Sequence, residues 1–128
     1  MSYYFSKIFD GNFDEAIEKV TAELKEEGFG ILTNIDVKET LEKKLDVDFP
    51  NYKILGACNP EFAYKVLQAE EHIGLMLPCN VIVFENKSGK TVVAAVDPNA
   101  SMQAINNPNL GEIAETVQGK LKSVIERL

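Results

Sequence analysis

The two cysteines of this chain are the side chains best suited to chemistry, because a thiol can act as a nucleophile, a redox centre or a metal ligand. They occur in a repeated phrase, Cys58-Asn59 and Cys79-Asn80, and each copy has a proline beside it. Both copies lie where an apolar, strand-like run meets another element. We therefore expect a reactive or ligand-binding site, if the chain has one, at these two junctions.

Cys58 is the stronger candidate for reactivity. The Asn59-Pro60 pair that follows it is typical of a helix start, and the unpaired N–H groups of a first helical turn favour a thiolate. The alternative is a small side chain packed at the buried end of a strand, which is common for free cysteine. Cys79 has no helix start beside it, so packing or a supporting role is favoured there.

Three helix starts share one design: Asn59-Pro60, Asp97-Pro98 and Asn107-Pro108 each place a short oxygen-bearing side chain before a proline. Capping explains these residue types, because the side chain accepts a backbone N–H and proline loses nothing at the first helical position. The first two starts directly follow predicted strands. Their positive dipole ends would then lie along one edge of the sheet, where they favour an anion.

Neither a metal site nor a glycine-rich phosphate loop is expected. His72 is the only histidine, so with Cys58 and Cys79 it makes three candidate ligands, one short of a structural zinc site. Its acidic neighbours indicate an exposed helix end. No glycine-rich phosphate loop with its lysine is present, and we expect no cofactor.

Charge and hydropathy exclude several classes of partner. Among 128 residues, 20 are acidic and 13 basic, giving a net charge of −7, which argues against nucleic acid. The apolar run from Ile73 to Phe84 is interrupted by Pro78 and is shorter than the ~20 residues that span a membrane. The N-terminus lacks a signal-peptide pattern, so we expect a cytoplasmic protein with reduced thiols.

Hydrophobic periodicity predicts a single α+β domain over residues 1–128, in the order β-α-β-α-β-α-β-β-α-α. Such an order implies about five strands, partly antiparallel, covered by helices. The strands are expected at residues 2–9, 29–35, 52–58, 81–85 and 91–96. The helices are expected from a capping box at Asn12 to Gly28, from Asp36 to Leu45, from Pro60 to Glu71, from Pro98 to Ile105, and after Asn109.

The segment from Ile73 to Pro78 is unusually apolar for a connection. Such a segment must be buried in the core, in a subunit interface or against a ligand. Core burial is the first expectation, and the interface of a two-fold dimer is the second.

Three phrases stand at Tyr52–Pro60, Gly74–Val81 and Val96–Pro98, with Ala63, Leu67 and Ala69 between the first two. Together they resemble domain-of-unknown-function family 302 over nearly the whole chain. The resemblance implies a curved antiparallel sheet against helices, a homodimer, and no established activity. The signature positions that it carries over are Cys58, Asn59, Pro60, Pro78, Cys79, Asn80, Asp97 and Pro98.

Three functions follow as hypotheses. The first is a module that binds or senses a small anionic or thiol-reactive molecule; its predicted ligand-binding residues are Cys58, Asn59, Cys79, Asn80 and Asp97. The second is a thiol redox or sulfur-transfer enzyme with Cys58 as nucleophile and Cys79 as resolving thiol. The third is a structural, dimerising adaptor domain. Whether the protein is an enzyme stays open at this point.

Overall fold

The computed structural model describes residues 2–128, so Met1 of the expected domain lies outside the described residues. The strands are β1 (Tyr4–Phe9), β2 (Gly30–Asp36), β3 (Tyr52–Cys58), β4 (Cys79–Glu85) and β5 (Thr91–Val96). The helices are α1 (Phe13–Glu26), α2 (Val37–Leu45), α3 (Pro60–Ala69), the 3₁₀ helix η1 (Glu71–Met76), α4 (Pro98–Ser101) and α5 (Gly111–Glu126).

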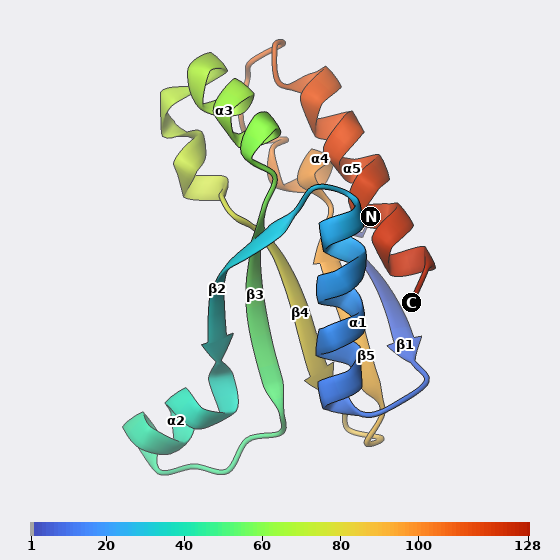
Figure 1. Ribbon diagram of the computed structural model, residues 1–128. Coiled ribbons are helices and arrows are strands. Elements are labelled where there is room, and N and C mark those ends of the chain that lie inside the picture. Colours follow the sequence, from blue (N-terminus) through green and yellow to red (C-terminus); the bar gives the residue numbers. More distant parts are fainter. Residues whose placement is uncertain (1) are drawn as a thin grey trace.

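The strands form a single open sheet in the order β1-β5-β4-β3-β2, and every neighbouring pair is antiparallel. This confirms the predicted α+β class with five strands. Because β4 pairs antiparallel with both β3 and β5, those two strands run the same way and end at the same edge of the sheet. Helices α3 and α4 begin directly after these two strands, at the upper edge in Figure 1.

The predicted capping box at the start of α1 is confirmed. The Glu15 backbone N–H donates to Asn12 Oδ1 over 2.9 Å, and the Asn12 N–H donates to Glu15 Oε1 over 3.1 Å. These bonds satisfy donors that have no partner within the helix. With its first turn fixed, α1 directs Ala16, Val20 and Leu24 into the core.

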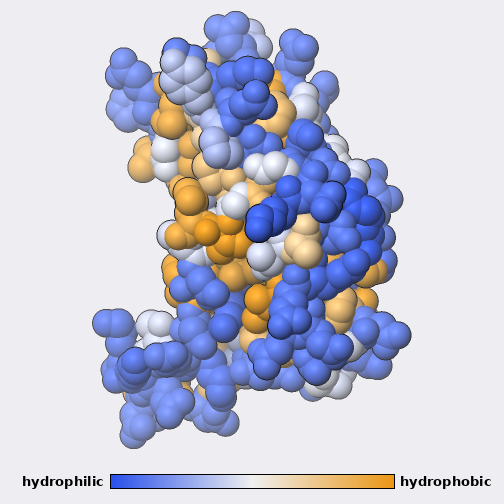
Figure 2. All heavy atoms as spheres, viewed as in Figure 1, coloured by the Kyte–Doolittle hydropathy of each residue, from blue (hydrophilic) through white to orange (hydrophobic). Residues whose placement is uncertain are grey.

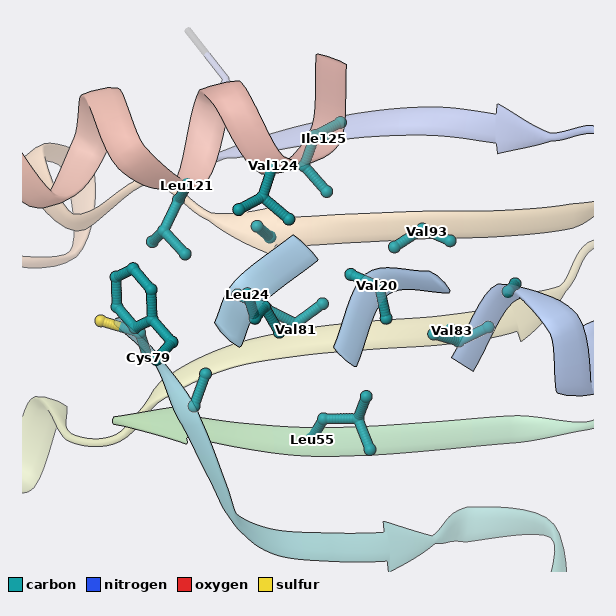
Figure 3. Close-up of a cluster of buried hydrophobic side chains, with 14 of the residues drawn as sticks. Val20, Leu24, Leu55, Cys79, Val81, Val83, Val93, Leu121, Val124 and Ile125 are labelled. Atoms are coloured by element: carbon teal, nitrogen blue, oxygen red, sulfur yellow. The ribbon is translucent and has the colours of Figure 1, made fainter. Parts of the chain in front are cut away.

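The core lies between one face of the sheet and the helices α1 and α5 (Figure 1). Figure 3 shows side chains from both helices pointing toward those of β3, β4 and β5; the labelled ones are Val20, Leu24, Leu121, Val124 and Ile125 from the helices and Leu55, Cys79, Val81, Val83 and Val93 from the sheet. The domain therefore has two layers, with both large helices on the same side of the sheet.

Several predicted helix bounds are wrong near the C-terminus. The helix expected from Pro98 to Ile105 ends at Ser101, and the last helix begins at Gly111 instead of directly after Asn109. The Asn107 side chain explains the later start, because its Nδ2 donates to the Ala69 carbonyl over 2.8 Å. That amide ties the connection to the end of α3 and makes a local turn instead of capping a helix.

The apolar segment after α3 forms the 3₁₀ helix η1 and is only partly buried. Ile73 is fully buried in a small second cluster with Val66 and Leu110, so core burial is confirmed for that side chain. Leu75, in contrast, is 83% exposed. The segment therefore contributes one anchor to the core and leaves another apolar side chain in solvent.

Candidate apolar binding site

A cavity of about 280 Å³ opens at the edge of the sheet where β3 and β5 end and β4 begins. Its wall combines the ends of these strands with side chains from α3, from α5 and from α4 and the residue after it; they include Phe62, Val66, Met102, Ile113 and Val117. Among residues 2–128, no charged side chain lines it. The volume is near the lower end of the ~300–1,000 Å³ typical of small-molecule pockets.

Both cysteines line this cavity, so the structure brings the two predicted junctions together. The sheet register explains the proximity, because Ala57 pairs directly with Cys79 across β3 and β4 and Cys58 is the next residue. Both are free thiols; Cys58 is half-buried, whereas Cys79 is buried.

The environment of Cys79 makes its thiolate unfavourable. Burial, and secondarily the proximity of Cys58, raises the pKa of Cys79 from an ordinary 9.0 to about 11. Desolvation penalises the charged form, which has no nearby cation to compensate among the groups that act on it. Cys79 is therefore protonated at neutral pH and contributes to the cavity as a small apolar side chain.

Gly56 shapes the same corner by its lack of a side chain. A Cβ atom added there would lie 2.7 Å from Pro78 Cγ and would also collide with the Thr33 side chain. Pro78 follows a cis peptide bond with Leu77 and itself lines the cavity. The glycine of the Gly-Ala-Cys phrase thus allows the segment before β4 to approach the end of β3 closely.

Asn59 lines the cavity, but its predicted capping role is wrong. Its side chain makes no cap hydrogen bond to α3. Instead, Asn59 Nδ2 donates to the Glu27 carbonyl over 3.2 Å, at the end of α1. The reason is the adjacent Gly28, which reverses the chain with a φ of +87° and brings the end of α1 against Asn59. The amide therefore joins two helices at the edge of the cavity.

Asp97 caps α4 as predicted and lies behind the cavity wall. Its Oδ1 accepts the Asn99 N–H over 3.0 Å, and both carboxylate oxygens accept from Gln118 Nε2 over 3.0 and 3.2 Å. Its neighbour Pro98 lines the cavity, while Asp97 does not. The carboxylate therefore fixes the position of α4 against α5 and does not present a charge to the cavity.

Asn80 is not brought together with the other predicted site residues. Side chains alternate between the two faces of a strand, so Asn80 points away from the face that Cys79 and Val81 share. It is exposed and lines a different hollow on the opposite side of the sheet.

Pro78 and Pro98 also line the cavity and are signature positions of the family resemblance, whereas the helix residues of the wall were not predicted as a site. Val66 and Val117, for example, have the spacing of ordinary core positions. The distinctive feature of the wall appears only in the structure, because Leu32 and Leu67, two apolar side chains that line the cavity, are exposed. Figure 2 shows apolar side chains gathered on this part of the surface, between α3 and the upper end of β2.

Metal ligands do not gather in the described part of the chain. In residues 2–128 no three His, Cys, Asp or Glu side chains lie close enough together to hold an ion. His72 is exposed on η1, as its neighbours predicted. Over the same residues, no helix combines the length and the apolar character needed to cross a membrane.

Comparison with known proteins decides the family. The pattern described as "Domain of unknown function DUF302" matches residues 5–128. The chain belongs to the DUF302 family. A solved structure, the uncharacterized conserved protein DUF302 from Bacillus stearothermophilus, is 31% identical and superposes with a TM-score of 0.92, covering 99% of this chain and 98% of that one.

The DUF302 chain also matches part of some larger curated proteins. It is 30% identical over 84 residues to "Fluoride-specific ion channel FluC 1" of Brucella suis and of Brucella abortus. The match covers 66% of this chain but only 33% and 31% of those relatives. This DUF302 chain therefore spans about a third of the length of the curated proteins it matches.

Proposed function

We propose that this DUF302 domain binds a small apolar molecule in the cavity beside Cys58. The observation that carries the proposal is a cavity of about 280 Å³ whose wall is apolar except for the half-buried Cys58 and the amide of Asn59. Cavities of this kind, with a few polar groups on an apolar wall, are the usual form of ligand sites.

The chemistry of the wall favours an uncharged guest over the anion that the helix starts predicted. Helix α4 has four residues, too few to sum an appreciable dipole. The Asn59 amide already donates to the Glu27 carbonyl, and the Asp97 carboxylate behind the wall repels an anion. An anion would therefore lose its hydration without gaining a cation in exchange.

The thiol of Cys58 gives this site a second property. It is the wall group with nucleophilic chemistry available, because the neighbouring Cys79 is held protonated by burial. A thiol-reactive apolar guest therefore fits the site in the same way as an inert one, with the apolar wall holding the guest next to the sulfur. Of the two ligand types that the sequence predicted, anionic and thiol-reactive, the proposal keeps the thiol-reactive one.

The direct test is a titration with toluene, followed by ¹⁵N–¹H NMR, on the wild type and on two matched variants. Ala63→Leu adds three carbons to the cavity wall, whereas Ala22→Leu makes the same change on an exposed position of α1. We expect toluene to shift resonances around Ala57, Cys79 and Val117, with affinity lowered about tenfold or more by Ala63→Leu and unchanged by Ala22→Leu.

Occupation of the cavity also predicts slower modification of Cys58. N-ethylmaleimide should label Cys58 more slowly when toluene is present, by the fraction of sites occupied. Absence of toluene-dependent shifts in the wild type, or equal affinity in Ala63→Leu and Ala22→Leu, would contradict a binding site in this cavity.

A second candidate function, thiol redox chemistry, is favoured by one observation: both thiols line the same cavity. Against it stands the pKa of about 11 for Cys79, which leaves only about one molecule in 10,000 as thiolate at pH 7. Diamide oxidation with intact mass measurement tests this candidate. Transfer of two hydrogens from the thiols to diamide, with a disulfide formed in minutes, would support it, and persistently free thiols would contradict it.

We further propose that the domain acts as a cytoplasmic homodimer. The exposed apolar side chains on the side of the sheet away from α1 and α5 support the dimer. The two free cysteines, with no disulfide to stabilise the fold, are in keeping with a reducing compartment.

A further inference from the structure

The two sides of the sheet differ in what covers them. Helices α1 and α5 lie on the side of Val81, Val83 and Val93 (Figure 3). The side chains that alternate with these point to the other side, where Ile82 pairs with Ile54 and Ala94. We call this other side the open face.

Apolar side chains dominate the open face across all five strands. Next to the central Ile82, Phe84 stacks on Tyr52 with ring centroids 5.3 Å apart. At the two edges, Tyr4, Ile8 and Ile35 are 44%, 59% and 48% exposed. An antiparallel sheet with one face in water normally alternates polar residues outward, and this sheet does not.

Charge is arranged in the opposite way. Within the described strands the charged residues are Lys7, Asp36, Lys53 and Glu85, and the register places every one of them on the side of the helices. Yet 26% of the residues in the chain are charged, and the net charge is −7. The open face is therefore a specific exception in an acidic protein.

We propose that the open face is the interface of a two-fold homodimer, in which two copies pack sheet against sheet. In a two-fold dimer each copy presents the same surface, so any charge on it would oppose its own copy or a near neighbour. Two chains of −7 each repel, and a contact between them is favoured where acidic groups are absent. The open face meets that condition. The inference rests on the proposed homodimer but not on the proposed ligand.

The size of the open face reaches the minimum that such a dimer needs. Five strands about 4.8 Å apart, with six or seven residues rising about 3.3 Å each, span about 24 by 21 Å, or roughly 500 Å². Two copies together bury about 1,000 Å², which reaches the lower limit for a specific interface. A hollow of about 490 Å³, lined by Tyr4, Ile82 and Phe84 among others, provides room for side chains of the second copy.

Sedimentation equilibrium of the full chain tests the proposal at about 1 to 100 µM protein. We expect the wild type to reach twice the 14.2 kDa mass of one chain. Ile82→Lys places a charge at the centre of the open face, and Ile8→Lys does so at an exposed edge position where folding is little affected. Each should raise the dimer dissociation constant about tenfold or more. Leu75→Lys, at a highly exposed apolar position on η1, is the matched control and should leave the dimer intact.

The outcomes separate the inference from its premises. A wild type that stays monomeric over the whole range of protein concentration overturns both the homodimer and the assignment of the open face. The same holds if a different protein covers the open face instead. A dimer that survives Ile8→Lys and Ile82→Lys but dissociates in Leu75→Lys overturns the open face and favours the η1 segment. The ligand is judged separately, because its cavity lies on the other side of the sheet: loss of toluene binding with the dimer intact contradicts the ligand alone.

Discussion

Replacing Cys79 with alanine is expected to change how the stability of the domain depends on pH. Cys79 is buried beside Cys58, and its pKa rises from 9.0 to about 11 in the folded chain. In the unfolded chain the thiol is solvated and titrates near its ordinary value. Between these two values the unfolded chain releases a proton that the folded chain retains.

The sign and size follow from that difference. Below pH 9 both states hold the proton, and the stability that Cys79 contributes is fully present. As the pH rises above 9, ionisation of Cys79 in the unfolded chain destabilises the fold, by about 2 kcal/mol at pH 10.5 and by roughly 3 kcal/mol once the pH is well above 11. The Cys79→Ala variant does not lose this stability at high pH, because it has no thiol to ionise. It does leave a small void that costs about 1 kcal/mol of stability at every pH.

Urea unfolding monitored by circular dichroism, in reducing buffer at several values from pH 7.5 to 10.5, measures the effect. We expect the wild type to be more stable than Cys79→Ala by about 1 kcal/mol at pH 7.5 and less stable by about 1 kcal/mol at pH 10.5. Cys58→Ala is the control and should keep most of the wild-type pH dependence, because Cys58 is the smaller cause of the raised pKa. Stability differences between wild type and Cys79→Ala that stay constant over the range would refute the reasoning.

Two further predictions concern the frame of the cavity, and both are measured by urea unfolding. Gly56→Ala should destabilise the domain by about 1–3 kcal/mol, because its Cβ would approach Pro78 too closely, whereas Gly119→Ala, in open space on α5, should be neutral or stabilising by up to about 1 kcal/mol. Equal effects of the two would show that the close approach is not tight. Asp97→Ala should cost about 1–2 kcal/mol by removing the α4 cap and the acceptor of Gln118, and Asp97→Asn should restore part of it by keeping one acceptor oxygen. An Asp97→Asn protein no more stable than Asp97→Ala would contradict the capping role.

Local signals in the sequence predicted the elements well where the physics is local. The Asn12 capping box is an example, because its hydrogen bonds join residues only three positions apart. The same holds for the hydrophobic stripes of α1 and α5, whose spacing places one face of each helix in the core.

Predictions that needed distant partners were less successful. Asn59 and Asn107 have the residue type of a cap, but their amides donate to the backbone carbonyls of Glu27 and Ala69, far away along the chain. An Asx side chain takes whichever partner the packed fold supplies, and the sequence does not reveal which carbonyls will be nearby. Likewise, Asn80 shares its phrase with Cys79, yet the alternation of the strand sends the two side chains to opposite faces.

The amino-acid sequence of the chain by itself determined the family, the α+β class and the positions of most strands and helices, because composition, periodicity and turn residues act over short distances. Only the tertiary structure decided that Cys58 and Cys79 line one cavity and that Asp97 lies behind its wall. It also decided that the open face of the sheet is apolar and uncharged. Cavities and faces arise from how elements pack, and packing depends on contacts between residues far apart in the chain.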